Sequence, residues 1–196
     1  IIKHFFLIFF FYFYRNNNSI FKLKHIFIFH GDSAFTVNKT FDDATLEKIN
    51  ALVNTIPDCD RLIHGDFHPK NIMMQGDEPL LIDMDTLGVG HSIFEFSAFF
   101  LTYYGYPYST PNPRDNEYFL GLTLEQMDRI YKAAFDKIFS SRNKEEQDSI
   151  QKKIELLAYI WLTQKTIIYE PENTFRLEHC KNKVVNLIKE VNTLEY

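Results

Sequence analysis

The sequence predicts an α+β fold that is mainly α-helical and carries one short β-hairpin. Hydrophobic residues make up 45% of the 196 residues, enough for one domain with a buried core. After residue 36, most of these residues recur at helical spacing. The exception is a pair of short apolar runs, residues 72–74 and 80–82, which flank the turn-forming sequence QGDEP and predict the hairpin.

Amphipathic helices are expected on both sides of the hairpin. Before it, polar capping residues at 40–43 precede an apolar stripe over residues 46–56 that stops at Pro57. After it, apolar spacing predicts helices over residues 93–103, 124–138, 150–168 and 177–191. Thr123 and Gln126 form a capping-box pattern, and the charged residues 140–148 are expected to break the helical pattern. The prolines and glycine of residues 104–113 predict a loop, either a plain surface loop or a substrate-side lid.

Residues 1–35 differ in composition from the rest of the chain. Residues 1–14, IIKHFFLIFFFYFY, are almost wholly apolar, but the run is shorter than the ~20 residues that a membrane-spanning helix requires. Arg15 and the asparagines after it stand where a signal peptide would carry a small-residue cleavage site. We therefore expect an atypical Phe-rich segment at 1–35, no membrane association, and a separate domain over residues 36–196.

Charge and cysteine content narrow the range of functions. A formal net charge of −5 leaves no basic stripe for nucleic acid and weakly favours cationic small molecules as partners. Cys59 and Cys180 are far apart in sequence, so neither a zinc site nor a disulfide framework is expected, and a cytoplasmic location is the default.

Most residues able to carry chemistry lie within residues 61–85, RLIHGDFHPKNIMMQGDEPLLIDMD. A short buried strand should deliver His64, Gly65 and Asp66 at its end. Pro69 prevents a regular helix, so that residues 66–71 should form a rigid loop.

The hairpin predicts that Asn71 and Asp83 lie close together. Its first strand leaves the loop just after Asn71, and its antiparallel second strand returns to Asp83, with neighbouring strands about 5 Å apart. Carboxamide and carboxylate oxygens suit Mg²⁺, which is usually held by one or two protein groups together with substrate phosphates and water. Asp66, on the same loop, is free to face a substrate hydroxyl.

The sequence HGDFHPKN, followed by LLIDMD, resembles the signature of the aminoglycoside phosphotransferase and choline kinase family, small-molecule kinases with a protein-kinase-like fold. The resemblance implies a kinase-like C-terminal lobe that transfers the γ-phosphate of ATP, or of another nucleoside triphosphate, to a small-molecule hydroxyl with the help of Mg²⁺. It makes Asp66 the catalytic base, and Asn71 and Asp83 the ligands of Mg²⁺.

The same resemblance implies supporting roles for other positions. His64 would brace the loop, His68 would have a structural role in it, and Asp85 would be a second acidic group near the metal or substrate. Where family members often carry Gly-Asp-Pro and then Asp-Leu-Ala, residues 90–97 read GHSIFEFS. His91 replaces an aspartate, whereas Glu95 keeps a carboxylate that can accept backbone hydrogen bonds from the loop.

The N-terminal lobe of such kinases has no clear counterpart in this sequence. No glycine precedes Gly31, and nothing marks Lys22, Lys24 or Lys39 as the lysine that binds the nucleotide phosphates. We therefore expect the N-lobe to be largely missing and the phosphotransferase to be incomplete in this chain.

Two alternatives remain open at this stage. One is a truncated kinase remnant without catalytic activity. The other is a metal-dependent hydrolase built on His64, Asp66 and His68, although the other histidines are scattered along the chain. The acceptor of a kinase is also open, with a weak preference for a cationic compound.

Overall fold

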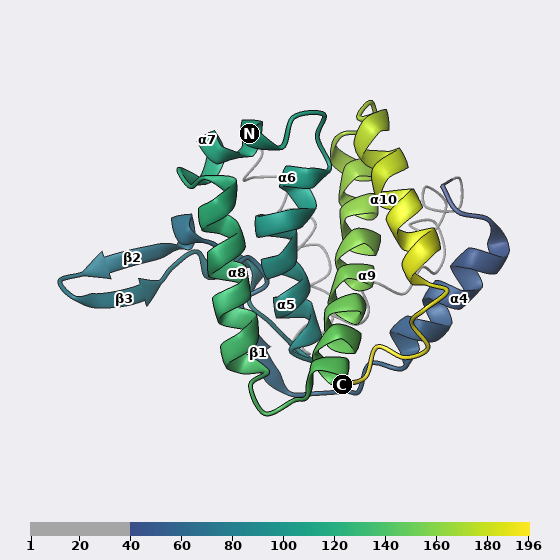
Figure 1. Ribbon diagram of the computed structural model, residues 1–196, viewed down its shortest axis with the longest axis horizontal. Coiled ribbons are helices and arrows are strands. Elements are labelled where there is room, and N and C mark those ends of the chain that lie inside the picture. Colours follow the sequence, from purple (N-terminus) through teal and green to yellow (C-terminus); the bar gives the residue numbers. More distant parts are fainter. Residues whose placement is uncertain (1–39) are drawn as a thin grey trace, which may run out of the picture.

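The computed structural model describes residues 40–196, except for the side chain of Asp85. It has the α+β, mainly helical architecture expected from the sequence, with a helical body from which one β-hairpin projects (Figure 1). The Phe-rich residues 1–35 and the lysines Lys22, Lys24 and Lys39 lie outside the described residues. Within residues 40–196, no helix combines the length and the hydrophobicity that crossing a membrane would need.

Helices make up most of the described chain, and the strands are short. The α-helices are α4 (Asp43–Asn54), α5 (Ile93–Phe100), α6 (Tyr106–Tyr108), α7 (Glu117–Leu120), α8 (Leu124–Ile138), α9 (Lys144–Tyr169) and α10 (Thr174–Leu187). The strands are β1 (Arg61–Ile63), β2 (Ile72–Gln75), β3 (Glu78–Leu81) and β4 (Gly88–Gly90). Short 3₁₀-helical segments cover Pro69–Asn71 (η2), Met84–Thr86 (η3) and Pro113–Asn116 (η5), and a π-helical segment, Leu101–Gly105 (η4), joins α5 to α6.

The strands form two separate antiparallel pairs. β2 and β3 make the predicted hairpin, in which Ile72 pairs with Leu81. β1, which was also predicted, pairs with β4, so that Ile63 lies opposite Gly88. The sequence did not predict β4, because Gly-Val-Gly offers a single apolar side chain and no alternation. The β1–β4 pair brings together the two ends of the stretch that carries the hairpin.

Side-chain caps fix where the helices begin. The predicted capping box of Thr123 and Gln126 is present at the start of α8. The predicted break over residues 140–148 is confirmed for 140–143 and wrong for 144–148, because Asn143 and Glu146 form a second capping box and α9 starts at Lys144. The early turns of α9 are exposed to solvent, where a helix needs no apolar stripe, so that hydrophobic periodicity alone missed them.

The predicted loop over residues 104–113 is wrong for its first half. Residues 104–108 continue the helix from α5 through η4 into α6. The N–H of Tyr106 donates to the carbonyl oxygen of Leu101, five residues back instead of four. The extra residue widens the turn just before Pro107, which would clash with the preceding turn of a regular helix. The π-helical turn therefore lets the helix pass a proline that the sequence marks as a breaker.

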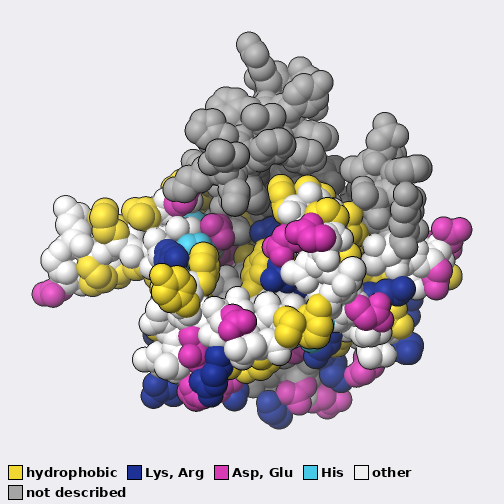
Figure 2. Space-filling model, turned by 90° about the horizontal axis from the view of Figure 1, so that it is seen from above, with side chains coloured by type: hydrophobic (Ala, Val, Ile, Leu, Met, Phe, Trp, Pro, Cys, Tyr) yellow, Lys and Arg dark blue, Asp and Glu magenta, His cyan; other side chains and the backbone are white. Residues whose placement is uncertain are grey.

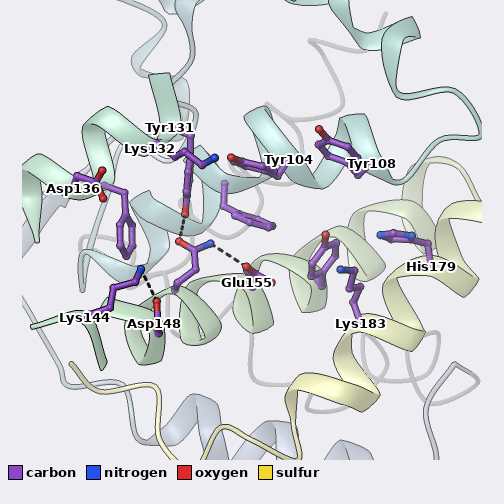
Figure 3. A pocket seen from close by; sticks show the side chains of 14 residues that line it. Tyr104, Tyr108, Tyr131, Lys132, Asp136, Lys144, Asp148, Glu155, His179 and Lys183 are labelled. Atoms are coloured by element: carbon purple, nitrogen blue, oxygen red, sulfur yellow. Dashed lines mark hydrogen bonds and ion pairs between the residues drawn. The ribbon is translucent and has the colours of Figure 1, made fainter. Parts of the chain in front are cut away.

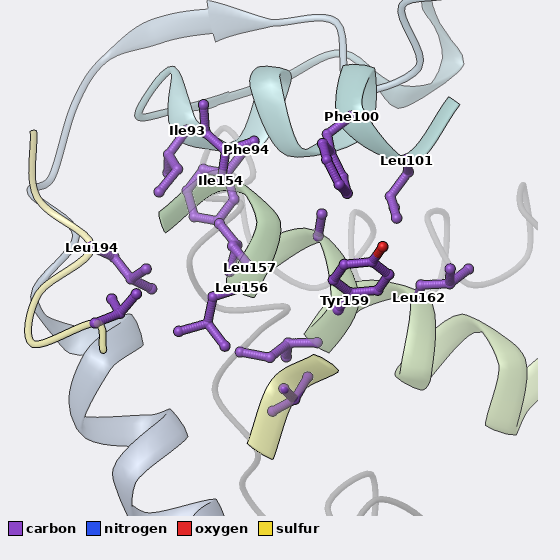
Figure 4. Packing of buried hydrophobic residues seen from close by; sticks show 14 of the residues in the cluster. Ile93, Phe94, Phe100, Leu101, Ile154, Leu156, Leu157, Tyr159, Leu162 and Leu194 are labelled. Atoms are coloured by element: carbon purple, nitrogen blue, oxygen red, sulfur yellow. The ribbon is translucent and has the colours of Figure 1, made fainter. Parts of the chain in front are cut away.

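The core lies where α5 packs against α9, with α10 along the other side of α9 (Figures 1 and 4). Ile93 and Phe94 of α5 and Leu157 of α9 are fully or almost fully buried there. α10 ends before the predicted helix over residues 177–191 does, but Leu194, beyond its end, is still buried and donates its N–H to Oγ1 of Thr55. The end of the chain is thereby attached to the end of α4.

We predict that Gly105→Ala destabilises the protein, although alanine normally favours a helix over glycine by about 1 kcal/mol. A Cβ atom at residue 105 would lie 2.5 Å from Cδ2 of Leu101, which is buried. Such overpacking typically costs about 1–3 kcal/mol, so urea denaturation should show a lower free energy of unfolding. In a Leu101→Ala background the same change should lose this cost. Strictly additive effects of the two substitutions would contradict the clash.

Candidate active site

The HGD loop, which we define as residues 64–71, leaves β1 and is held by the ring of His64. His64 is buried, its Nδ1 accepts a hydrogen bond from the N–H of Asp66 at 3.2 Å, and its Nε2 lies 3.0 Å from the carbonyl oxygen of Ile82. Because Nδ1 is an acceptor, the neutral ring carries its proton on Nε2 and donates it to Ile82. One side chain therefore sets the spacing between Asp66 and the end of the hairpin.

Glu95, in the first turn of α5, anchors the start of the HGD loop. Its Oε2 accepts hydrogen bonds from the N–H groups of His64 (2.7 Å) and Gly65 (3.1 Å), which are the contacts expected of Glu95 from the sequence. Gly65 has a φ of 76°, and a Cβ atom there would lie 3.3 Å from the carbonyl oxygen of Thr86. This position therefore requires glycine for both its backbone conformation and its close approach to η3.

Asn71 lies against Asp66 at the other end of the loop. Its side chain is buried, and its Nδ2 donates to the carbonyl oxygen of Asp66 at 2.9 Å and to Oδ2 of the same residue at 3.2 Å. The amide nitrogen is thereby committed, which fixes the orientation of the carboxamide. Among the described residues, no hydrogen bond to Oδ1 of Asn71 is present, so that this oxygen can serve as a ligand.

Asp83 follows the hairpin and lies close to Asn71, because the β2–β3 pairing brings the two ends of the hairpin together. The N–H of Ile82 donates to the carbonyl oxygen of Asn71 at 2.8 Å, which places Asp83 one residue beyond that pair. Asp83 is exposed and has φ 62° and ψ 61°, and it is the one non-glycine residue with positive φ in the described part of the chain. Backbone strain of this kind is concentrated at functional sites. Asp85 lies in η3, and its predicted role stays a prediction because its side chain is not described.

The surroundings of Asp66 favour its ionised form. Burial raises the pKa of the Asp66 carboxyl, but the hydrogen bond and charge of His68, the charge of Lys165 and the amide of Asn71 together lower it below its ordinary value. His68 Nε2 lies 3.5 Å from Oδ2 of Asp66. Lys165 belongs to α9, and no local motif could have linked it to the HGD loop.

The HGD loop is also covered by α7, which the sequence analysis did not select. The Nζ atom of Lys70 lies 3.9 Å from the centroid of the Phe119 ring, a cation–π distance. The same ring meets His68 edge-on, at 6.4 Å between centroids. The contact joins segments far apart in sequence, and nothing in the residues around Phe119 marks it in advance.

Comparison with known protein families matches residues 33–131 to the phosphotransferase enzyme family, over about half of the chain. The chain belongs to the phosphotransferase enzyme family. The matched residues include the HGD loop, the hairpin and α5. No curated protein and no solved structure matches the chain. Family membership therefore indicates phosphate transfer as the general type of chemistry.

The geometry of the site does not favour a hydrolase built on His64, Asp66 and His68. Among the described side chains, which do not include that of Asp85, no three of His, Cys, Asp or Glu come together in a way that could hold a metal ion. Both ring nitrogens of His64 already form hydrogen bonds. Asn71 and Asp83 offer a carboxamide oxygen and a carboxylate, donors that suit the hard cation Mg²⁺ better than zinc.

We predict that Glu95→Ala lowers the free energy of unfolding by about 2 kcal/mol, because two backbone N–H groups of the HGD loop lose a charged acceptor. Urea denaturation measures the change. The control is Glu47→Ala on the exposed face of α4, which should change the free energy of unfolding by no more than about 0.5 kcal/mol. Equal effects of the two substitutions would show that Glu95 does not anchor the loop.

We predict that an NMR titration finds the pKa of the Asp66 carboxyl below the ordinary value of about 3.9, and that His68→Gln raises it. Since the pKa is lower in the folded than in the unfolded state, ionised Asp66 stabilises the fold above the unfolded-state pKa. This stabilisation is lost as the pH falls through the folded-state pKa. An unchanged pKa in His68→Gln would mean that His68 does not act on Asp66.

Proposed function

We propose that residues 36–196 form the C-terminal lobe of a protein-kinase-like small-molecule kinase, which moves the γ-phosphate of ATP to a hydroxyl group of an acceptor. The observation that carries this proposal is the contact between Asn71 and Asp66. It commits the amide nitrogen of Asn71, leaves its oxygen for a cation, and holds a carboxylate beside that oxygen. Membership of the phosphotransferase family supports phosphate transfer as the reaction type.

Asp66 is the group that would meet the acceptor hydroxyl. Its side chain is 46% exposed, so a substrate can reach it, and its lowered pKa keeps it ionised at neutral pH. A carboxylate with a low pKa is a weak base. It orients the hydroxyl first and accepts the proton as the bond to phosphorus forms, when the hydroxyl has become acidic.

Asn71 and Asp83 would hold Mg²⁺. One is a neutral oxygen donor whose orientation is fixed, and the other is an exposed carboxylate held in a strained backbone conformation. Bound there, Mg²⁺ supplies neutralisation of the charge on the nucleotide phosphates. His64 supports both ends of the site, because it contacts Asp66 and the residue before Asp83.

Nucleotide binding also needs groups outside the HGD loop. Residues 40–196 contain no glycine-rich loop of the kind that such kinases place over the phosphates. The hairpin offers an apolar surface for a nucleotide base or a second lobe (Figure 2), and the exposed hydrophobic side chains along it include Met73, Met74, Leu80 and Ile82. Binding of Mg·ATP is therefore the first property to test, and turnover the second.

The acceptor in this proposal is a small molecule with a hydroxyl group. The net charge of −5 favours a cationic compound only weakly. Nearby charges count for more than the net charge, because screening removes effects beyond about 8 Å at physiological salt. The positive charge of Lys165 acts on Asp66. An acceptor that combines a hydroxyl with a neutral or anionic group is therefore included among the candidates.

We predict that Mg·ATP raises the melting temperature of the chain, that Asp83→Ala abolishes this shift, and that Asp66→Asn keeps it. Asp83 is assigned to the metal, whereas Asp66 is assigned to the hydroxyl. In an assay with a suitable acceptor, Asp66→Asn should lower the rate of phosphate transfer by at least about 10²-fold. Asp77→Asn, in the exposed turn of the hairpin, is the matched control for both measurements.

Two results would contradict the proposal. If Asp66→Asn kept the wild-type rate of turnover, Asp66 could not be the catalytic base. Absence of any shift at millimolar Mg·ATP, with folding verified by circular dichroism, would favour the alternative of a kinase remnant that does not bind nucleotide.

A further inference from the structure

A cavity of about 720 Å³ opens between α8, α9 and α10 (Figure 3). Its volume lies within the range of roughly 300–1,000 Å³ typical of small-molecule sites. Phe100, Tyr104 and Tyr108, from the continuous helix of α5, η4 and α6, close it on one side. Nothing in the proposed phosphate transfer uses this cavity.

The cavity is separate from the HGD loop. α5 directs Glu95 toward that loop through its hydrogen bonds. Phe99 lies between the two surfaces, because its ring contacts Phe67 at 5.8 Å between centroids and stacks on Tyr131 of the cavity wall at 5.5 Å. Successive residues turn by about 100° around a helix, so that Phe100 and Tyr104 point to the other side. The described residues that line the cavity include none from 64–90.

Aromatic rings form much of the cavity wall. Phe100 stacks on Tyr104 at 5.4 Å between centroids, and Tyr104 stacks on Tyr108 at 5.9 Å. Tyr131 and Tyr159 face Phe100 edge-on. Ring faces of this kind attract cations as well as apolar groups. The cavity itself contains an example, because Nζ of Lys183 lies 5.7 Å from the centroid of Tyr159.

Glu155 supplies a carboxylate at the centre of these rings (Figure 3). It is half-buried and accepts one hydrogen bond, from Nε2 of Gln151 at 3.0 Å, while Oε1 of Gln151 accepts from the hydroxyl of Tyr131. Within residues 40–196, Glu155 has no cationic side chain at ion-pair distance. The pKa of Tyr159 is raised, mainly by burial and then by the negative charge of Glu155. The electric field of this carboxylate therefore reaches the cavity wall.

The charged side chains that line the cavity are balanced, three of each sign, but none of the three lysines lies within ion-pair distance of Glu155. Lys144 pairs with Asp148 at 2.9 Å, and Lys132 pairs at 2.9 Å with Asp128, which does not line the cavity. Lys183 and Asp136 contribute one further charge of each sign. His179 adds none at neutral pH, because burial, and then the charge of Lys183, lower its pKa.

We propose that this cavity binds an organic cation, an amine whose apolar body rests on the aromatic walls and whose charge pairs with Glu155. The inference is independent of the proposed kinase activity, since it concerns a different surface. It assigns a second small-molecule site to the chain, on the opposite side of α5 from Asp66.

The test compares three probes with the same aromatic body and different charge: phenethylamine, 2-phenylethanol and phenylacetate. Isothermal titration calorimetry on the full chain should show that the amine binds at least about tenfold more tightly than the alcohol, with phenylacetate weakest. Equal affinities for the three probes, or no binding of the amine at 10 mM, would overturn the proposal.

Variants locate the site. Glu155→Gln, which preserves shape, should reduce amine binding to the level of the alcohol, whereas Tyr108→Ala at the exposed rim should weaken amine and alcohol alike. Glu47→Gln on α4 is the matched control, and circular dichroism verifies folding. Asp66→Asn should leave amine binding unchanged. Loss of amine binding in Asp66→Asn, or its retention in Glu155→Gln, would place the amine elsewhere and overturn the assignment, whatever the outcome with Mg·ATP.

Discussion

The candidate active site depends on the attachment of the HGD loop to the N-terminus of α5. Glu95 accepts the N–H groups of His64 and Gly65, and the ring of His64 then contacts both the N–H of Asp66 and the carbonyl oxygen of Ile82. A chain of hydrogen bonds therefore leads from the packed helix to the loop and to the end of the hairpin. Because α5 is packed against α9, these hydrogen bonds attach the loop to the closely packed core and restrict its motion.

The helix that starts at Ile93 has different roles on its two sides. One side carries Glu95, which positions the HGD loop, while the other carries Phe100 and Tyr104, which line the aromatic cavity. The π-helical turn at Leu101–Gly105 extends this helix past Pro107 and so adds Tyr108 to the cavity. A ligand in the cavity and a substrate at Asp66 would thus contact the same rigid element from opposite sides.

Features encoded by neighbouring residues could be predicted from the sequence. The capping box at Thr123 and the hairpin around Gly76 follow from local residue types and spacing, whereas the hydrogen bonds to Glu95 were expected only from the family resemblance. The role of Pro107 was misjudged, because the compensating π-helical turn arises from packing and not from the proline itself. The contacts of Phe119 and Lys165 with the site were not predictable, since they join segments that only the tertiary fold brings together.

The central claim is that Asn71 and Asp83 together bind the metal of a metal–nucleotide complex. Paramagnetic Mn²⁺ in place of Mg²⁺ tests it directly, through line broadening in the ¹⁵N–¹H spectrum of the chain with ATP present. The account predicts that the side-chain amide of Asn71 and the backbone amides around Asp83 broaden first, while those near Leu194 stay sharp. Uniform broadening, or broadening that spares Asn71 and Asp83, would contradict it.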